Sequence, residues 1–75
     1  MNRKEIEQKI KEIVALQFGI RIKKIQSDTG FMSDLNADSL DTIEIIMALE
    51  DRFDIHIASE EAEQLLTIES VVDYI

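Results

Sequence analysis

Ser39 is the side chain whose neighbours first suggest chemistry, because it stands in the run ADSLD, residues 37–41. A serine hydrolase places its nucleophile in a Gly-x-Ser-x-Gly turn and pairs it with a histidine base. The flanks here contain no glycine, and the only histidine, His56, stands between two isoleucines, which is more typical of a structural residue. The sequence therefore predicts no catalytic residue, and the tripeptide Asp-Ser-Leu by itself indicates only the start of a helix.

The acidic residues around Ser39 imitate a calcium loop without completing it. Asp34, Asn36 and Asp38 occupy the first, third and fifth positions of an EF-hand loop. The sixth position is Ser39 and the twelfth is Ile45, where the loop requires glycine and a bidentate glutamate. The chain also has no cysteine, so it offers no disulfide, thiolate zinc site or thiol of its own. We expect no metal site.

The helix that begins at Ser39 carries more apolar residues than one buried face needs. Asp38 can cap it, with the charge of Asp41 near its positive end. On a helical wheel one apolar stripe suits a core, and it contains Thr42, Ile45, Ile46, Leu49 and Phe53. A second stripe lies roughly opposite, with acids between its members, and it contains Leu40, Ile43 and Met47.

Two interpretations of the second stripe remain open from periodicity alone. Its residues could pack against the preceding loop or a following helix as ordinary core. They could also form an exposed strip that docks in a basic, partly apolar groove of a partner, with Met47 adapting to several partners. The acids that interleave with it are Glu44, Glu50, Asp51 and Asp54.

The remaining pattern predicts an all-α fold, a small four-helix bundle in one domain over residues 1–75. The first helix has apolar residues at helical spacing and stops at Gly19. A long loop follows over residues 20–37, which the apolar residues Ile22, Ile25, Phe31 and Leu35 should attach to the core. We expect a short third helix from Ser59 through Leu65 with a serine cap, and a fourth from Thr67 to Ile75.

Composition limits the partners. The 75 residues carry a net charge of −8, with ten acids but only Arg52 as a base between Asp34 and Glu63. That balance excludes nucleic-acid binding, which needs a basic surface, and favours partners with basic patches. No apolar run is long enough to span a membrane, and the charged N-terminus lacks a signal-peptide core. We expect a cytoplasmic monomer, although a chain whose leader had been removed would look the same.

The run DLNADSLDTIEIIMALEDRFDIHI, residues 34–57, resembles the centre of an acyl carrier protein, and most closely the free-standing carriers of dissociated (type II) fatty-acid synthesis. Asp38, Ser39 and Leu40 match the modification motif of that family, and the following DTIEIIMALE matches its recognition helix. The last two helices of the family are matched by SEEAEQLLTIESVVDYI, so the resemblance spans almost the whole chain.

The resemblance implies a carrier rather than an enzyme. In this family a phosphopantetheinyl transferase with Mg²⁺ moves 4'-phosphopantetheine from coenzyme A to the motif serine, here Ser39. The terminal thiol of the arm then holds acyl chains as thioesters, which suits a chain without cysteine. Acyl-processing enzymes with basic docking patches would meet the recognition helix at Asp41, Ile43, Glu44, Met47, Glu50 and Asp51.

Three positions depart from the family pattern. Asn36 replaces a usual glycine, but asparagine also tolerates a left-handed backbone. Ala58 and Ser59 replace a common proline and acid, which should loosen that loop yet keep a cap, and Arg52 interrupts an acidic run. Two alternatives stay open: a specialised carrier of polyketide, amino-acyl or hydroxy-acyl groups, and a non-carrier acidic docking subunit.

Overall fold

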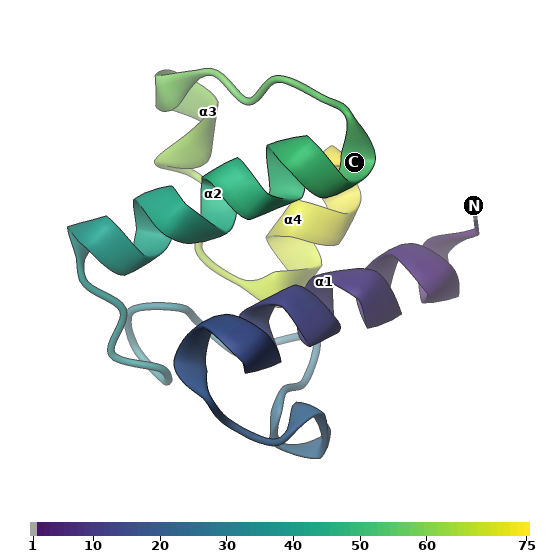
Figure 1. Cartoon of the computed structure of the whole chain (residues 1–75), viewed down its shortest axis with the longest axis vertical. Coiled ribbons are helices and arrows are strands. Elements are labelled where there is room, and N and C mark those ends of the chain that lie inside the picture. Colours follow the sequence, from purple (N-terminus) through teal and green to yellow (C-terminus); the bar gives the residue numbers. More distant parts are fainter. Residues whose placement is uncertain (1) are drawn as a thin grey trace.

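The computed structural model describes residues 2–75, and within them it is built from helices joined by loops, as the sequence predicts (Figure 1). In chain order the elements are α1 (Arg3–Phe18), the 3₁₀ turn η1 (Ile22–Lys24), α2 (Ser39–Phe53), α3 (Ser59–Ala62) and α4 (Ile68–Tyr74). The only β-type pairing in these residues is an isolated bridge between Gly30 and Thr67. The fold is all-α.

The core forms where α1 packs against both α2 and α4. The largest fully buried side chains come from these three helices and are Ile10, Val14, Leu49, Ile68 and Val71. Burial of several branched side chains at one meeting point stabilises a domain this small, because each contributes about 1.5–3 kcal/mol. Among residues 2–75 no helix is long and apolar enough to cross a membrane.

Local signals set the ends of α1. The side chain of Asn2 accepts a hydrogen bond from the Glu5 amide at 2.9 Å and so caps the N-terminus. Gly19 ends the helix in the left-handed conformation, at a φ of 65°, as predicted.

The long loop between α1 and α2 is attached to the bundle at several points. Ile25 and Phe31 are buried, as predicted, whereas Ile22 and Leu35 are half-buried. The carbonyls of Ser27 and Thr29 accept the first amides of α4, which a helix start otherwise leaves without partners. A loop of this length can therefore remain ordered without regular structure of its own.

The third helix is shorter than predicted and its cap is different. It ends at Ala62 rather than Leu65, because the amides of Gln64 and Leu65 bond three residues back and the Leu66 carbonyl accepts from Phe31 at 2.9 Å. The expected serine cap is wrong. Ala58 is the N-cap and no side chain caps the helix, since Ser59 comes one position too late, inside the first turn.

The fourth helix keeps the residues that the sequence assigned to it, with one residue at each end serving as a cap. Thr67 is the N-cap and exchanges hydrogen bonds with Ser70 in a capping box. Ile75 is the C-cap. The difference from the predicted span of Thr67 to Ile75 is therefore one of helix ends rather than of the helix itself.

Candidate functional site

Ser39 is the first residue of α2 and is exposed. The cap is made by Asp38, whose Oδ1 accepts from the Asp41 amide at 2.9 Å, while Asp41 Oδ2 accepts from the Asp38 amide at 3.3 Å. This capping box satisfies the helix start without the serine hydroxyl. Ser39 is thereby left at the positive end of the α2 dipole, where a negatively charged group is favoured.

The turn before Ser39 contains one residue, Asn36, in the left-handed backbone conformation. Asn36 has a φ of 59°, a conformation that asparagine tolerates better than most residues. The next residue, Ala37, is buried, and its amide bonds the Phe31 carbonyl at 2.9 Å. The expectation that Asn36 can take the place of glycine in this turn is confirmed. The turn fixes where α2 begins relative to Phe31.

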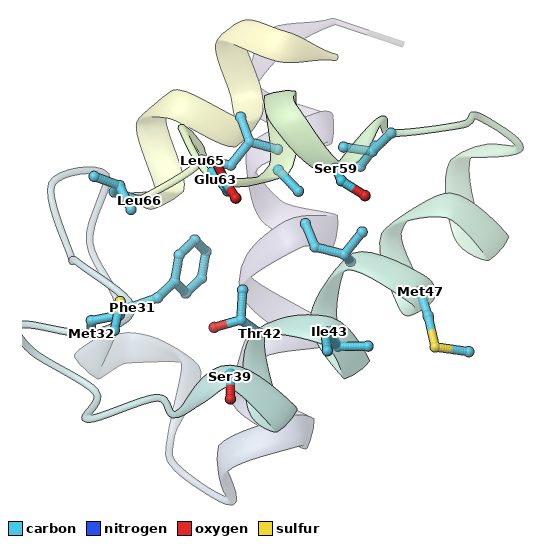
Figure 2. Close-up of a pocket in the computed structure, with 13 residues that line it drawn as sticks. Phe31, Met32, Ser39, Thr42, Ile43, Met47, Ser59, Glu63, Leu65 and Leu66 are labelled. Atoms are coloured by element: carbon cyan, nitrogen blue, oxygen red, sulfur yellow. The ribbon is translucent and has the colours of Figure 1, made fainter.

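A cavity of about 550 Å³ opens beside Ser39, between α2, α3 and the segment before α4 (Figure 2). Its lining is largely apolar and includes Phe31, Ile46, Ile57, Leu65 and Leu66. Figure 2 shows the Phe31 ring directed into this space, whereas the Ser39 hydroxyl points outward, away from the ring. The polar residues among those that line the cavity are Ser39, Thr42, Ser59 and Glu63. The volume is within the usual range for small-molecule pockets.

The two apolar stripes of α2 differ in burial. In the core stripe Ile45 and Leu49 are buried and the other members are half-buried. In the second stripe Leu40, Ile43 and Met47 are 62%, 55% and 62% exposed. Of the two interpretations, the structure rejects ordinary core packing for the second stripe. Ile43 and Met47 also line the cavity, so the exposed stripe and the cavity share an edge.

The acidic side chains of α2 differ in exposure and in whether they accept hydrogen bonds within the molecule. Asp51 is exposed, whereas Asp41 belongs to the capping box. Glu44 accepts a hydrogen bond from the Gln17 side chain of α1 at 2.5 Å. Glu50 turns toward the chain that follows α2, where its Oε2 accepts from the Ile57 amide at 2.8 Å. Among the expected docking acids, the carboxylates of Asp41, Glu44 and Glu50 therefore each accept a hydrogen bond within the molecule.

Other ionisable groups lie outside this arrangement. His56 is exposed, with Nδ1 at 3.4 Å from Glu50 Oε2. A hydrogen bond from Ser27, aided by Lys11, lowers the pKa of Glu7 on α1. A hydrogen bond to Glu61 raises the pKa of Tyr74. Residues 2–75 contain no group of three His, Cys, Asp or Glu side chains placed to hold a metal ion. None of these groups lines the cavity beside Ser39.

Sequence reasoning missed the cavity and two residues at it. Met32 and Leu66 are exposed apolar residues that line the cavity from the long loop and from the segment before α4. Neither lies in a periodic pattern, because both stand in irregular chain. Their only signal in the sequence is an apolar side chain beside turn residues, which does not indicate a site.

Residues 8–75 match the family model described as "Phosphopantetheine attachment site". The match covers most of the 75 residues, and the chain belongs to this family. It is a carrier protein that bears covalently attached 4'-phosphopantetheine, and its role is non-catalytic. Its partners are, in general terms, the transferase that supplies the group and the enzymes that process what it carries. The residues present fit such a group, since an exposed hydroxyl at a helix N-terminus suits a phosphodiester.

Proposed function

We propose that this protein carries acyl groups as thioesters between enzymes of fatty-acid biosynthesis in the cytoplasm, with 4'-phosphopantetheine attached to Ser39. The observation that carries the proposal is the position of Ser39, which is exposed at the capped start of α2 and borders the largely apolar cavity. Asp38 and Leu40 flank it, Asp38 by fixing the helix start and Leu40 by presenting an exposed apolar side chain.

The lining of the cavity supports a hydrocarbon cargo. Phe31, Ile46, Ile57 and Leu65 offer no hydrogen-bonding side chain to a polar substituent. Burial of methylene groups against such a surface is favourable by about 0.8 kcal/mol each. A fatty acyl chain gains more from this lining than an amino-acyl group, whose ammonium would have to be desolvated.

The exposed stripe of α2 supports docking of basic partners. Leu40, Ile43 and Met47 offer apolar anchors, and Glu44 and Asp51 are exposed acids on the same helix. Apolar anchors supply most of the binding energy in such contacts, whereas charges raise the association rate and select the partner. The transferase and the acyl-processing enzymes would meet this surface with Lys- and Arg-rich patches.

The cargo itself tests the pathway. The protein would be isolated from its own cells under conditions that preserve thioesters, and the mass of the group on its arm would be read. We expect simple fatty acyl and β-hydroxyacyl chains that form a series of increasing length. A cargo made mainly of amino-acyl or polyketide groups would contradict the fatty-acid assignment and identify a specialised carrier.

A further inference from the structure

The loop between α2 and α3 forms one wall of the cavity beside Ser39. Ile57 and Ser59 line the cavity from this side. Ile57 is buried, although the residues on either side of it do not belong to a helix. The contacts that hold the α2–α3 loop in place therefore also determine the distance between this wall of the cavity and α2.

Glu50 makes hydrogen bonds at both ends of this loop. Its backbone carbonyl accepts from the amides of Asp54 and Ile55, which ends α2 with Asp54 in a left-handed conformation. Its side-chain Oε2 accepts from the Ile57 amide at 2.8 Å, seven residues along the chain. The side chain is 27% exposed, so water competes only in part for this carboxylate.

We propose that Glu50 is a positioning residue: its carboxylate holds the α2–α3 loop in place and so controls how readily the cavity opens to a cargo. That the cavity receives cargo rests on the function proposed above, whereas the hydrogen bonds of Glu50 do not. This role is separate from the docking role that the sequence suggested for Glu50, which stays a prediction.

The chemistry of the carboxylate suits this task. An ionised carboxylate is an acceptor only, and a hydrogen bond that it accepts from a backbone amide is stronger than one between neutral groups. The Ile57 amide belongs to a buried residue, so loss of its acceptor would leave a donor without a partner unless the loop moved toward water. The loop is expected to move, because no helix restrains it.

The neighbouring acids of α2 are not placed to do the same. Glu44 bonds Gln17 on α1, and Asp51 is exposed. His56 lies on the loop itself, and its Nδ1 is 3.4 Å from the same Glu50 oxygen, but its ring is almost fully exposed. The amide of Ile57 is therefore the main group that the carboxylate of Glu50 holds.

Amide hydrogen exchange, followed by NMR on protein without an attached arm, tests the proposal. Glu50→Ala removes the acceptor, Glu50→Gln keeps one acceptor oxygen, and Asp51→Ala removes the same charge from the next position. We expect Glu50→Ala to accelerate exchange of the Ile57 amide by about tenfold or more, with a change of less than about threefold at Leu49 in the core. The Gln and Asp51→Ala variants should stay within about threefold of the wild type at both amides.

Cavity opening is read on the same proteins with the neutral fluorescent probe N-phenyl-1-naphthylamine. The affinity for this probe should change by about threefold or more in Glu50→Ala and return most of the way to the wild-type value in Glu50→Gln, which keeps an acceptor oxygen for the Ile57 amide although its hydrogen bond is weaker. If Glu50→Ala does not fold, Glu50→Met preserves side-chain length without the carboxylate and carries the same comparison.

Three results would overturn the proposal: unchanged Ile57 exchange in a folded Glu50→Ala or Glu50→Met protein, equal acceleration at Ile57 and Leu49, or the same effects from Asp51→Ala. All of these measurements omit coenzyme A and the transferase. A failure here is therefore distinct from a failure of Ser39 as the attachment residue.

Discussion

Side chains only two positions apart on α2 have opposite environments. Leu49 is fully buried, whereas Met47 is 62% exposed. Periodicity assigned each to a stripe, but it could not decide whether the second stripe met solvent or protein, because that depends on where the other helices lie. The local backbone at Ser39 was easier to predict, since Asp38, Asp41 and the left-handed Asn36 act within a few residues.

Substitution of these two residues separates packing from docking. Leu49→Ala should lower the free energy of unfolding by about 2–5 kcal/mol, as expected for a fully buried leucine. Met47→Ala should change it by less than about 1 kcal/mol, since exposed positions contribute little. The measurement is a denaturant titration of each variant beside kcat/KM for loading by a phosphopantetheinyl transferase.

The rate at which the transferase attaches phosphopantetheine should instead depend on the exposed stripe, among the variants that remain folded. Met47→Ala should lower kcat/KM, mainly through weaker association, and Glu44→Lys should lower it more strongly at low salt, because it removes attraction toward a basic groove. A Met47→Ala protein that unfolds as easily as Leu49→Ala would contradict the exposed-stripe account. Kinetics of Glu44→Lys equal to the wild type at low salt would contradict it as well.

At the scale of elements, the sequence predicts helix ends that are marked by the residues at those ends. It does not predict features that depend on hydrogen bonds to residues outside the helix. Gly19 and Thr67 mark helix ends through their own backbone or side chain. After the early end of α3, the amides of Gln64 and Leu65 bond three residues back, and the Leu66 carbonyl accepts a hydrogen bond from the distant Phe31 amide. The inward turn of Glu50 likewise depends on Ile57. No pattern within a single helix encodes such long-range partners.

The hydrogen bond between Ser27 in the long loop and Glu7 on α1 should make the stability of the fold depend on pH. Ser27 Oγ donates to Glu7 Oε1 at 2.8 Å, which is the main reason that the Glu7 pKa lies below 4.5 in the folded protein. A carboxyl with a lowered folded pKa contributes stability above its unfolded pKa, and that contribution is lost as the pH falls through the folded value.

Ser27→Ala should therefore destabilise the fold at neutral pH by about 0.5–1.5 kcal/mol. The difference from the wild type should shrink as the pH falls through the lowered folded pKa of Glu7, because Glu7 is then protonated in both states. Denaturant midpoints at a series of pH values measure this, with Ser33→Ala as an exposed serine control from the same loop. A Ser27→Ala effect that is constant down to acidic pH would contradict the role of Glu7.

At the scale of the whole molecule, charge is unevenly distributed. The net charge is −8, and only Arg52 offsets the acids between Asp34 and Glu63. Among residues 2–75 the ion pairs are few: Arg3 with Asp73, Lys11 with Glu7, and His56 with Glu50 when the histidine is protonated. Like charges on α2 and α3 therefore repel one another in the folded state, while the same charges favour basic partners.

Salt should stabilise this fold by screening that repulsion. We expect the melting temperature of the protein without its arm to rise by about 4–8 °C between low and moderate ionic strength, which corresponds to about 1 kcal/mol in a domain of this size. The double variant Asp51→Asn/Glu60→Gln should show a smaller rise, because it removes two exposed charges. A melting temperature independent of salt would show that the repulsion is negligible.

The identity of the modified residue tests the central claim most directly. Wild-type protein, Ser39→Ala and Ser59→Ala would each be incubated with coenzyme A, Mg²⁺ and a promiscuous transferase, and their intact masses measured. Ser59 is the matched control, because it is also an exposed serine at a helix start that lines the same cavity. We predict the addition of one phosphopantetheine to the wild type and to Ser59→Ala, and none to Ser39→Ala, whose circular dichroism should remain helical. Modification of a folded Ser39→Ala protein, or none of the wild type, would contradict the account.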